Sequence, residues 1–298
     1  MDSQLISAII TTYKRDKKYL KRAILSVLNQ TYTNFELIIV DDNGQNEFQY
    51  IVEETIKEIN PNVHIKVIKH EQNMGAQVAR NNGIRSANGK FIAFLDDDDE
   101  WIENKLDLQL KKFNTNNKLG LVYCWYNICK NNEKTKKIRK PSKNLRKGIR
   151  DLLRTNFIGS TSFPLIKKEC FDKVGLFDET LKAKQDYDMW LRICKEYQID
   201  FVEVPLCNYY IHSDERITSN VQNKLESEEI FLKKHINDIN KDKKALSFKY
   251  RLIGSYYLKL KNIHAGRRCI LKSILIYPFS YKTYINYLLS FLKKEHQK

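Results

Sequence analysis

The sequence predicts an α/β fold, with a mixed, mainly parallel sheet flanked by helices and an α-helical extension after it. Through the first hundred residues, continuous apolar runs alternate with segments of helical spacing, as in sheets whose parallel strands are buried on both faces. From about residue 218 onward the pattern is almost entirely helical. We therefore expect two parts, residues 1–217 and residues 218–298.

Four apolar runs predict the parallel strands, and three amphipathic segments predict the helices between them. The strands are "LISAIITTY" (5–13), "FELIIVDD" (35–42), "VHIKVIKH" (63–70) and "GKFIAFLDD" (89–97). The helices are residues 20–30, 48–59 and 75–87. Because ligands bind beyond the carboxyl ends of such strands, the polar ends "TTYKR", "VDDN" and "LDDDDEW" indicate a site at one edge of the sheet.

Beyond residue 100 the elements are less regular. The pattern predicts a helix over 102–114, a strand pair around 119–129, a helix over 186–197 and another strand pair in 199–212. The remaining residues predict paired amphipathic helices, broken near Asn262 and at Pro278.

The charge balance limits the choice of partners. There are 52 Lys and Arg against 36 Asp and Glu, a net charge of +16, which favours nucleic acid, anionic membranes or anionic small substrates. No zinc finger, RNP or helix-turn-helix signature is present, so we expect no nucleic acid partner. The basic, aromatic C-terminal helices indicate peripheral contact with an anionic membrane, although a plain packed helical hairpin explains them as simply.

The location is predicted from three absences in the sequence. No basic region followed by an apolar run opens the chain, and no stretch approaches the roughly 18 apolar residues of a membrane span. The six cysteines show no CxxC pair or zinc-ligand spacing, which is typical of reduced, buried thiols. We expect a cytoplasmic protein that contacts the inner face of the plasma membrane peripherally.

The stretch "FLDDDDEW" (94–101) is the clearest candidate for chemistry. It places five acidic side chains in a row after an apolar strand, where their like charges repel. A solvated acidic turn is one interpretation. A site for Mg²⁺ or Mn²⁺ is the other, with Asp96 and Asp98 pointing the same way if the strand continues. The position at the end of a parallel strand favours the cation site.

Two other carboxylates also stand at informative positions. Asp42 is either a turn residue in "DDNG" or a group that accepts hydrogen bonds from a ribose or a base. No GxGxxG follows the first strand, which disfavours a nicotinamide or flavin cofactor. Asp186 opens a predicted helix and is either its N-cap or a fixed, ionised general base.

Five segments, in order and at the expected separations, resemble the family-2 glycosyltransferases, which are inverting enzymes of the GT-A fold. They are "ISAIITTYKR", "FELIIVDDN", "NMGAQVARNNGI", "GKFIAFLDDDDEW" and "VGLFDETLKAKQDYDMWLRI". The resemblance covers roughly residues 4 to 212. It implies a metal-dependent transfer of a sugar from a UDP-sugar to a hydroxyl of a glycan or a lipid-linked oligosaccharide, in the biosynthesis of cell-surface polysaccharide.

The resemblance also implies the residues that bind the nucleotide sugar. Thr11 and Tyr13 match residues that line the uracil and ribose site. Asp42 matches the carboxylate that reads the uracil N–H, and Arg80 an arginine near the base and diphosphate. Asp97 matches a ribose contact.

The DXD motif and the catalytic base follow from the same resemblance. Asp98 matches the direct ligand of Mn²⁺ or Mg²⁺, and Asp96 a supporting ligand. Asp186 matches the base that takes a proton from the acceptor hydroxyl. Where the family often has Glu-Asp, this chain has Gln185-Asp186, which leaves one carboxylate and bears on how the acceptor is positioned.

Weaker expectations concern the neighbouring loops. His212 and Arg216 lie where such enzymes often have a mobile loop over the diphosphate, although an ordinary surface loop is an equal alternative. Ser160, in "GSTSF", is a candidate acceptor contact. We expect Asp99 and Glu100 to begin the next helix, where acidic residues suit the helix dipole.

Other functions are less well supported. A sugar-nucleotide pyrophosphorylase would need a Gly-rich, Arg-bearing loop after the first strand, and "TTYKRDKK" has no glycine. A processive polysaccharide synthase is disfavoured because a QxxRW motif and membrane spans are missing. A catalytically inactive nucleotide-sugar-binding protein is the non-enzyme alternative, and the presence of both Asp98 and Asp186 argues against it.

Overall fold

A computed structural model describes residues 4–130, 133–139, 148–211 and 220–292. The chain folds as two compact units. We call the first the sheet unit; it consists of Met1–Gly148, Phe157–Asp178 and Met189–Ser213. The second, the helical unit, consists of Ile149–Asn156, Glu179–Asp188 and Asp214–Lys298. The predicted boundary between residues 217 and 218 lies outside the described residues.

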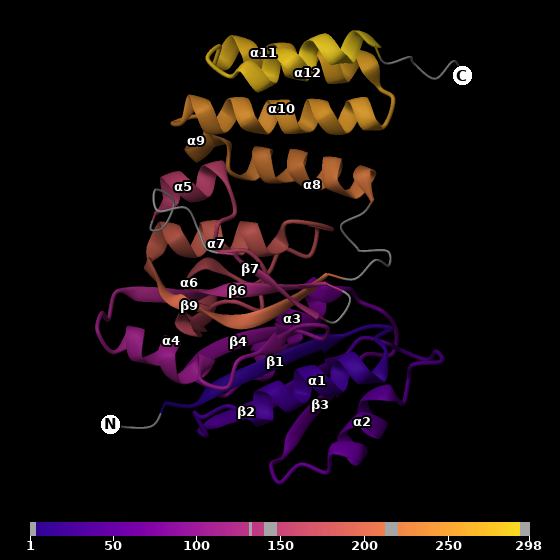
Figure 1. The fold of residues 1–298 in the computed structure, drawn as a ribbon, viewed down its shortest axis with the longest axis vertical. Coiled ribbons are helices and arrows are strands. Elements are labelled where there is room, and N and C mark those ends of the chain that lie inside the picture. The colour runs from indigo at the N-terminus through magenta and orange to yellow at the C-terminus, as the bar shows by residue number, and fades with distance from the viewer. Residues whose placement is uncertain (1–3, 131–132, 140–147, 212–219, 293–298) are drawn as a thin grey trace. The chain divides into compact units, whose positions relative to one another are not determined.

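The sheet unit contains one mixed sheet of nine strands (Figure 1). Their order is β3-β2-β1-β4-β8-β6-β9-β5, and β7 pairs with β6. The strands are β1 (Ile6–Thr12), β2 (Phe35–Asp41), β3 (Ile65–Lys69), β4 (Phe91–Asp96), β5 (Glu100–Trp101), β6 (Leu119–Lys130), β7 (Glu133–Arg139), β8 (Leu165–Lys167) and β9 (Gln198–Ile211). The four predicted parallel strands are confirmed as β1 to β4. The strand pair expected in 199–212 is instead one long strand, β9, which runs parallel to β6.

Helices of the predicted type connect the parallel strands. They are α1 (Lys17–Leu28), α2 (Ile51–Ile59), α3 (Ala76–Ser86) and, after β5, α4 (Lys105–Phe113). Two more helices, α6 (Glu169–Val174) and α7 (Gln185–Glu196), follow β8. The Asp16 carboxylate caps α1 by accepting a hydrogen bond from the Lys18 amide, which explains why α1 begins where it does.

The register of the sheet brings the polar strand ends to one edge. Thr12 at the end of β1 lies opposite Asp41 at the end of β2, and Thr11 lies opposite Asp96 at the end of β4. The central strands β1, β2 and β4 are mostly buried and largely apolar, so the sheet positions these ends on a rigid base. The predicted convergence of polar groups at the carboxyl ends is therefore confirmed.

The helical unit is built from helices packed on one another. They are α5 (Ile149–Arg154), α8 (Val221–Lys234), α9 (Ile236–Ile239), α10 (Lys243–Lys259), α11 (Ile263–Ile276) and α12 (Tyr281–Leu289), with a 3₁₀ turn at Ser290–Leu292. Both predicted breaks are confirmed: Asn262 caps α11, and Pro278 lies between α11 and α12. No helix within the described residues is long and apolar enough to cross a membrane.

Helix α3 packs very closely on the sheet at Gly83. A Cβ atom placed there would lie 2.6 Å from Cγ2 of Ile9 in β1 and 3.4 Å from Cγ2 of Val40 in β2. Glycine usually weakens a helix by about 1 kcal/mol relative to alanine. Close packing against two buried strands is the physical reason for a glycine here.

We predict that Gly83→Ala destabilises the protein, reversing the usual sign of a Gly→Ala change in a helix. The loss is about 1–3 kcal/mol, because the added methyl group overpacks Ile9. The free energy of unfolding, measured by denaturant titration, checks this. In an Ile9→Ala background the same substitution should be much less harmful, and equal costs in both backgrounds would contradict the packing explanation.

Candidate active site

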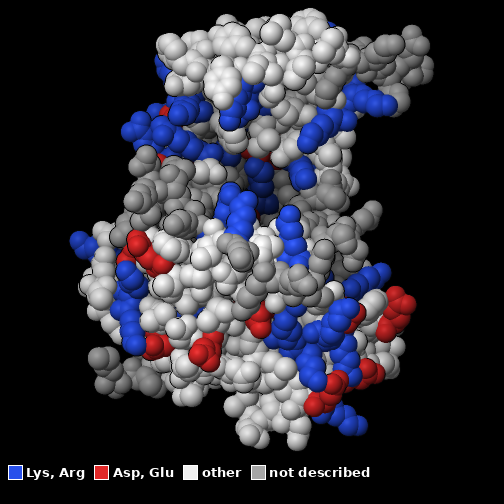
Figure 2. All heavy atoms as spheres, viewed as in Figure 1, with Lys and Arg blue, Asp and Glu red and all other residues white. Residues whose placement is uncertain are grey.

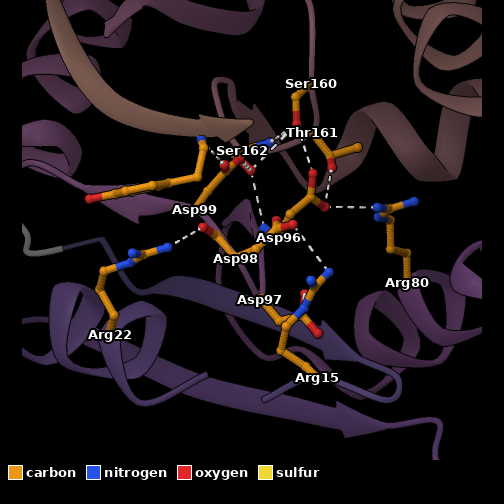
Figure 3. Close-up of polar contacts among 11 residues, drawn as sticks. Arg15, Arg22, Arg80, Asp96, Asp97, Asp98, Asp99, Ser160, Thr161 and Ser162 are labelled. Carbon is orange, nitrogen blue, oxygen red and sulfur yellow. Dashed lines mark hydrogen bonds and ion pairs between the residues drawn. The ribbon is translucent and has the colours of Figure 1, made fainter. Parts of the chain in front are cut away.

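The acidic stretch after β4 forms a tight turn instead of continuing the strand (Figure 3). The Asp99 amide donates a hydrogen bond to the Asp96 carbonyl over 3.0 Å, so strand alternation no longer decides where the carboxylates between them point. Glu100 lies in β5, opposite Asn208 of β9. The expectation that Asp99 and Glu100 begin a helix is wrong: pairing with β9 keeps the chain extended, and α4 starts only at Lys105.

Asp96, the last residue of β4, accepts hydrogen bonds from three side chains (Figure 3). Arg80 Nη2 donates to Oδ1 over 2.9 Å, Thr161 Oγ1 to the same oxygen over 3.0 Å, and Ser160 Oγ to Oδ2 over 2.8 Å. Burial opposes ionisation, but the charge of Arg80 and these hydrogen bonds outweigh it, so the pKa of Asp96 is lowered. The predicted site residues Arg80 and Ser160 are thus brought together around a third, Asp96.

Asp97 and Asp98 share a single arginine. Arg15 Nε donates to Asp97 Oδ1 over 2.7 Å, and Arg15 Nη2 lies 3.1 Å from Asp98 Oδ2 (Figure 3). Burial raises the pKa of Asp97 to about 6, with the charge of Arg15 opposing and that of Asp98 adding to the rise. The Asp98 side chain remains 23% exposed, so an incoming ligand can reach its carboxylate.

Asp99 is fully buried and serves the architecture of the turn. Its carboxylate accepts hydrogen bonds from Ser162 Oγ over 2.7 Å and from the Tyr210 amide over 3.1 Å. Burial, together with the charges of Asp98 and Asp96, raises the pKa of Asp99 well above its usual value. Ser162 Oγ also accepts a hydrogen bond from the Asp96 amide, so one hydroxyl ties both ends of the turn together.

The donor set of this turn suits a hard divalent cation. Such ions take carboxylate oxygens, and Mg²⁺ usually combines one or two carboxylates with substrate phosphates instead of an all-protein cage. In the part of the chain that the structure describes, no three His, Cys, Asp or Glu side chains form a ready-made metal cluster. The accessible carboxylate of Asp98 fits that mode of binding, with Asp96 held beside it by Arg80.

The remaining donor-site candidates of the sheet unit occupy neighbouring positions. Thr11 lies in β1, directly opposite Asp96. Tyr13 follows the end of β1 and is 41% exposed, so its ring is available for a planar ligand. The next residue, Lys14, has a left-handed backbone with φ of 48°, and its amide donates to Asn43 Oδ1 over 2.6 Å. This contact joins the loops that follow β1 and β2.

Asp42 is almost fully buried, and its two carboxylate oxygens together have four polar contacts. One oxygen accepts from the Met74 amide over 2.7 Å and contacts His70 Nδ1 at 2.7 Å. The other accepts from the Gly75 amide over 2.9 Å and Asn73 Nδ2 over 3.0 Å. A carboxylate has about four lone-pair sites, so a base N–H that bound here would replace one of these donors.

Asp186 lies in the first turn of α7, within the part of α7 that belongs to the helical unit. Asn156 Nδ2 donates to its Oδ2 over 3.2 Å, and the Tyr187 amide lies 2.7 Å from its Oδ1. The carboxylate is partly exposed. Lys184, just before the helix, has φ of 64°, so the chain turns sharply into α7 at this point.

A network of buried charges holds the residues around Asp186 in place. Glu228 of α8 is completely buried, and its carboxylate forms ion pairs with Lys184 and with Lys249 of α10. Lys249 Nζ also lies 4.6 Å from the centre of the Tyr187 ring, which stacks on Phe231. Burial lowers the pKa of Lys249 to about 8, although the Glu228 carboxylate acts in the opposite direction.

Asp188 forms a second anchor one turn into α7. His235 Nε2 lies 2.8 Å from its Oδ1, and Lys234 Nζ donates to its Oδ2 over 3.0 Å. Both Asp188 and His235 are buried. The start of α7 is therefore fixed to α8 by charged side chains on both sides of Asp186.

Several residues of the site escaped prediction. They are Arg15, Thr161 and Ser162, which contact the acidic turn, and Arg22, whose Nη2 donates to the Asp98 carbonyl over 2.5 Å. "TTYKR" and "GSTSF" were recognisable as polar segments, but only the tertiary fold assigns their side chains to these carboxylates. The predicted loop residues His212 and Arg216 lie outside the described residues.

Known proteins resemble this chain over most of its length. Residues 7–175 match the family described as "Glycosyl transferase family 2". The chain is 34% identical over 221 residues to the UDP-Glc:alpha-D-GlcNAc-diphosphoundecaprenol beta-1,3-glucosyltransferase WfgD of Escherichia coli, which covers 74% of this chain and 82% of that protein. It is also 34% identical over 224 residues to an uncharacterized glycosyltransferase of Methanocaldococcus jannaschii. That alignment covers 74% of this chain and 76% of the relative.

A solved structure shows the same fold. S. aureus TarS 1-349, in complex with UDP-GlcNAc, matches with a TM-score of 0.67 at 15% identity, over 98% of this chain and 93% of that one. At this identity the likeness shows the fold alone. The predicted fold class, GT-A with a C-terminal helical region, is confirmed.

We predict that Lys249→Met changes how stability depends on pH. The pKa of Lys249 is about 8 in the folded protein and about 10.5 in an unfolded chain, so between these values the unfolded state binds more protons. The free energy of unfolding of the wild type should therefore rise with pH over that range by about 3 kcal/mol because of this lysine, and the variant should lack this rise.

Denaturant titrations of both proteins between these pH values measure the effect. Lys57→Met, at an exposed position in α2, is the matched control and should follow the wild type. A difference between wild type and Lys249→Met that stays constant with pH would contradict the burial of a charged Lys249.

Proposed function

Because this chain belongs to glycosyl transferase family 2, we propose that it is a metal-dependent, inverting glycosyltransferase that uses a UDP-sugar donor. Family membership makes it a glycosyltransferase; the metal, the donor and the inversion are our proposal. The observation that carries the proposal is the acidic turn after β4, at the carboxyl ends of the parallel strands. There the accessible carboxylate of Asp98 contacts Arg15, and the neighbouring Asp96 pairs with Arg80.

We assign the donor to the edge of the sheet unit. Thr11, Tyr13 and Asp42 line the place proposed for uracil and ribose, with Asp97 contacting the ribose. Asp98 is the proposed ligand of Mn²⁺ or Mg²⁺, supported by Asp96. Arg80 contributes positive charge next to Asp96, which favours an anionic diphosphate nearby. The chemistry that a divalent cation supplies when bound here is Lewis-acid stabilisation of the departing diphosphate.

We assign proton transfer to Asp186. Its partly exposed carboxylate is held by Asn156 and by the anchored start of α7, as a general base must be. In the proposed step the carboxylate takes the proton of an acceptor hydroxyl, the hydroxyl oxygen bonds to the anomeric carbon, and the bond to the diphosphate breaks on the opposite face. The configuration at that carbon is thereby inverted.

The acceptor that we propose is a glycan or a lipid-linked oligosaccharide in the biosynthesis of cell-surface polysaccharide. The name of WfgD gives that relative a diphosphoundecaprenol-linked acceptor, and the relative aligns over 82% of its own length. This support comes from similarity. A sugar-nucleotide pyrophosphorylase is not favoured, because the family match covers 7–175.

We predict that UDP binding depends on a divalent cation through Asp98. With Mn²⁺ present, a panel of UDP- and GDP-sugars should show thermal stabilisation and slow donor hydrolysis with at least one UDP-sugar. Asp98→Ala should weaken metal-dependent UDP binding about tenfold or more, as expected for loss of a charged ligand. Asp107→Ala, which removes a partly exposed carboxylate that pairs with Lys111 one turn along α4, is the control.

The proposal has two clear failure modes in this assay. If no nucleotide sugar stabilises the protein or is hydrolysed, the enzyme is not a UDP-sugar transferase. If Asp98→Ala binds UDP and Mn²⁺ as tightly as the wild type does, Asp98 is not the metal ligand.

We predict that Asp186→Asn separates catalysis from binding. Transfer should fall by about a hundredfold or more, because the amide cannot accept the proton, while the dissociation constant for UDP stays unchanged. The control is Asp238→Asn in α9, which should retain full activity. Loss of donor binding in Asp186→Asn would show that this carboxylate does not act as the base.

A further inference from the structure

An apolar surface covers the end of the helical unit. Of the nineteen large apolar side chains that are exposed among the described residues, ten fall between positions 271 and 292. We call them the C-terminal apolar face: Leu271, Leu275, Phe279, Tyr281, Tyr284, Ile285, Leu288, Leu289, Phe291 and Leu292. Figure 2 shows the end of this unit, at the top of the view, as a mostly white surface.

Helix α12 exposes apolar side chains and buries polar ones, whereas a helix that packs in a core does the opposite. Its small polar residue Thr283 and the following Ser290 are buried, whereas Leu288 and Leu289 are 67% and 51% exposed. Exposed positions 281, 284, 285 and 288 recur at the spacing of one helix face. Large exposed apolar patches on proteins usually mark a binding site.

The described helices that carry this face, together with α10 before them in the chain, hold charged side chains of one sign only. Residues 243–292, which form α10 to the end of the described chain, contain ten Lys and Arg and no Asp or Glu. Lys272 and Lys282 are both exposed and stand within the segment that carries the face. Lys272 Nζ lies 4.2 Å from the centre of the Tyr250 ring, and Lys282 lies beside Tyr281.

We propose that the C-terminal apolar face binds the surface of a membrane that contains anionic phospholipids. Leucine, isoleucine and phenylalanine side chains enter the boundary between headgroups and acyl chains, and tyrosines suit the headgroup level. The lysines extend from the same helices to the phosphates, because long cationic side chains bury their stems and keep the charge in water.

Lipid explains these observations better than a protein partner does. Lysine is depleted in the cores of protein interfaces, whereas here Lys272 and Lys282 stand in the same helices as the exposed apolar side chains. An anionic membrane accounts for the lysines and for the absence of Asp and Glu from residues 243–292, because its surface attracts cations and repels carboxylates. The inference needs neither the proposed donor nor the proposed base, so it can fail or succeed independently of them.

Vesicle sedimentation with the full chain tests the proposal. We expect binding to vesicles of mixed phosphatidylcholine and phosphatidylglycerol, weaker binding to phosphatidylcholine alone, and a decrease at high salt. The double variant Leu288→Ser/Leu292→Ser should weaken partitioning by about a hundredfold, at about tenfold per leucine. Lys272→Gln/Lys282→Gln should weaken it by about twenty-five-fold, at roughly fivefold per charge.

Matched substitutions on the sheet unit control for surface changes as such. Val63→Ser and Lys57→Gln alter an exposed apolar and an exposed cationic residue and should leave vesicle binding unchanged. Thermal unfolding and UDP binding are measured in parallel, so that a variant that misfolds is recognised. If a double variant misfolds, the corresponding single variants are tested in its place.

Two results would overturn the proposal. One is absence of binding to anionic vesicles, or binding that the leucine variants leave intact. The other is concentration-dependent self-association, seen by light scattering and abolished by Leu288→Ser, with no vesicle binding, in which case a second copy of the chain covers the face.

Discussion

Repulsion among four consecutive carboxylates, Asp96 to Asp99, is the constraint on which the sheet unit depends. Two like charges about 4 Å apart repel by roughly 1 kcal/mol in water and by several times that near a protein surface. The fold compensates with Arg15 and Arg80, with hydroxyl groups from one loop, and with a raised pKa that favours the uncharged form of Asp99. Segments that are distant in sequence, from β1 to β9, are therefore fixed by one turn.

The sequence predicted this edge of the sheet well because its signals are local. Buried strands read as apolar runs, and their polar ends are visible without a structure, which is why Asp96, Asp98 and Asp42 could be singled out. The partners of those carboxylates were not predictable in the same way. Arg15 and Arg22 are two basic residues among many in their segment, and only tertiary packing selects them. The prediction that Asp99 begins a helix was wrong for a related reason, because the residues that follow it pair with β9 and stay extended.

The helical unit contains the proposed catalytic base. It includes residues 179–188, and therefore carries Asp186 on a turn that is fixed by the buried pairs of Glu228 and Asp188. Buried ion pairs contribute little net stability, because desolvation offsets their attraction, but removing one partner is costly. Their effect here is to specify one geometry for a short, sharply turned segment. A sequence motif marks the carboxylate, but not the helices that hold it.

Arg15 places a permanent positive charge in the acidic turn, and this charge matters for the ligand-free state of the protein. A cation that arrives with a diphosphate and leaves with it would expose bare carboxylates each time it departs. The guanidinium of Arg15 is part of the chain and cannot diffuse away, and it contacts both Asp97 and Asp98. If a cation binds there as proposed, the turn would keep its shape after the cation has left, because its positive charge is part of the chain.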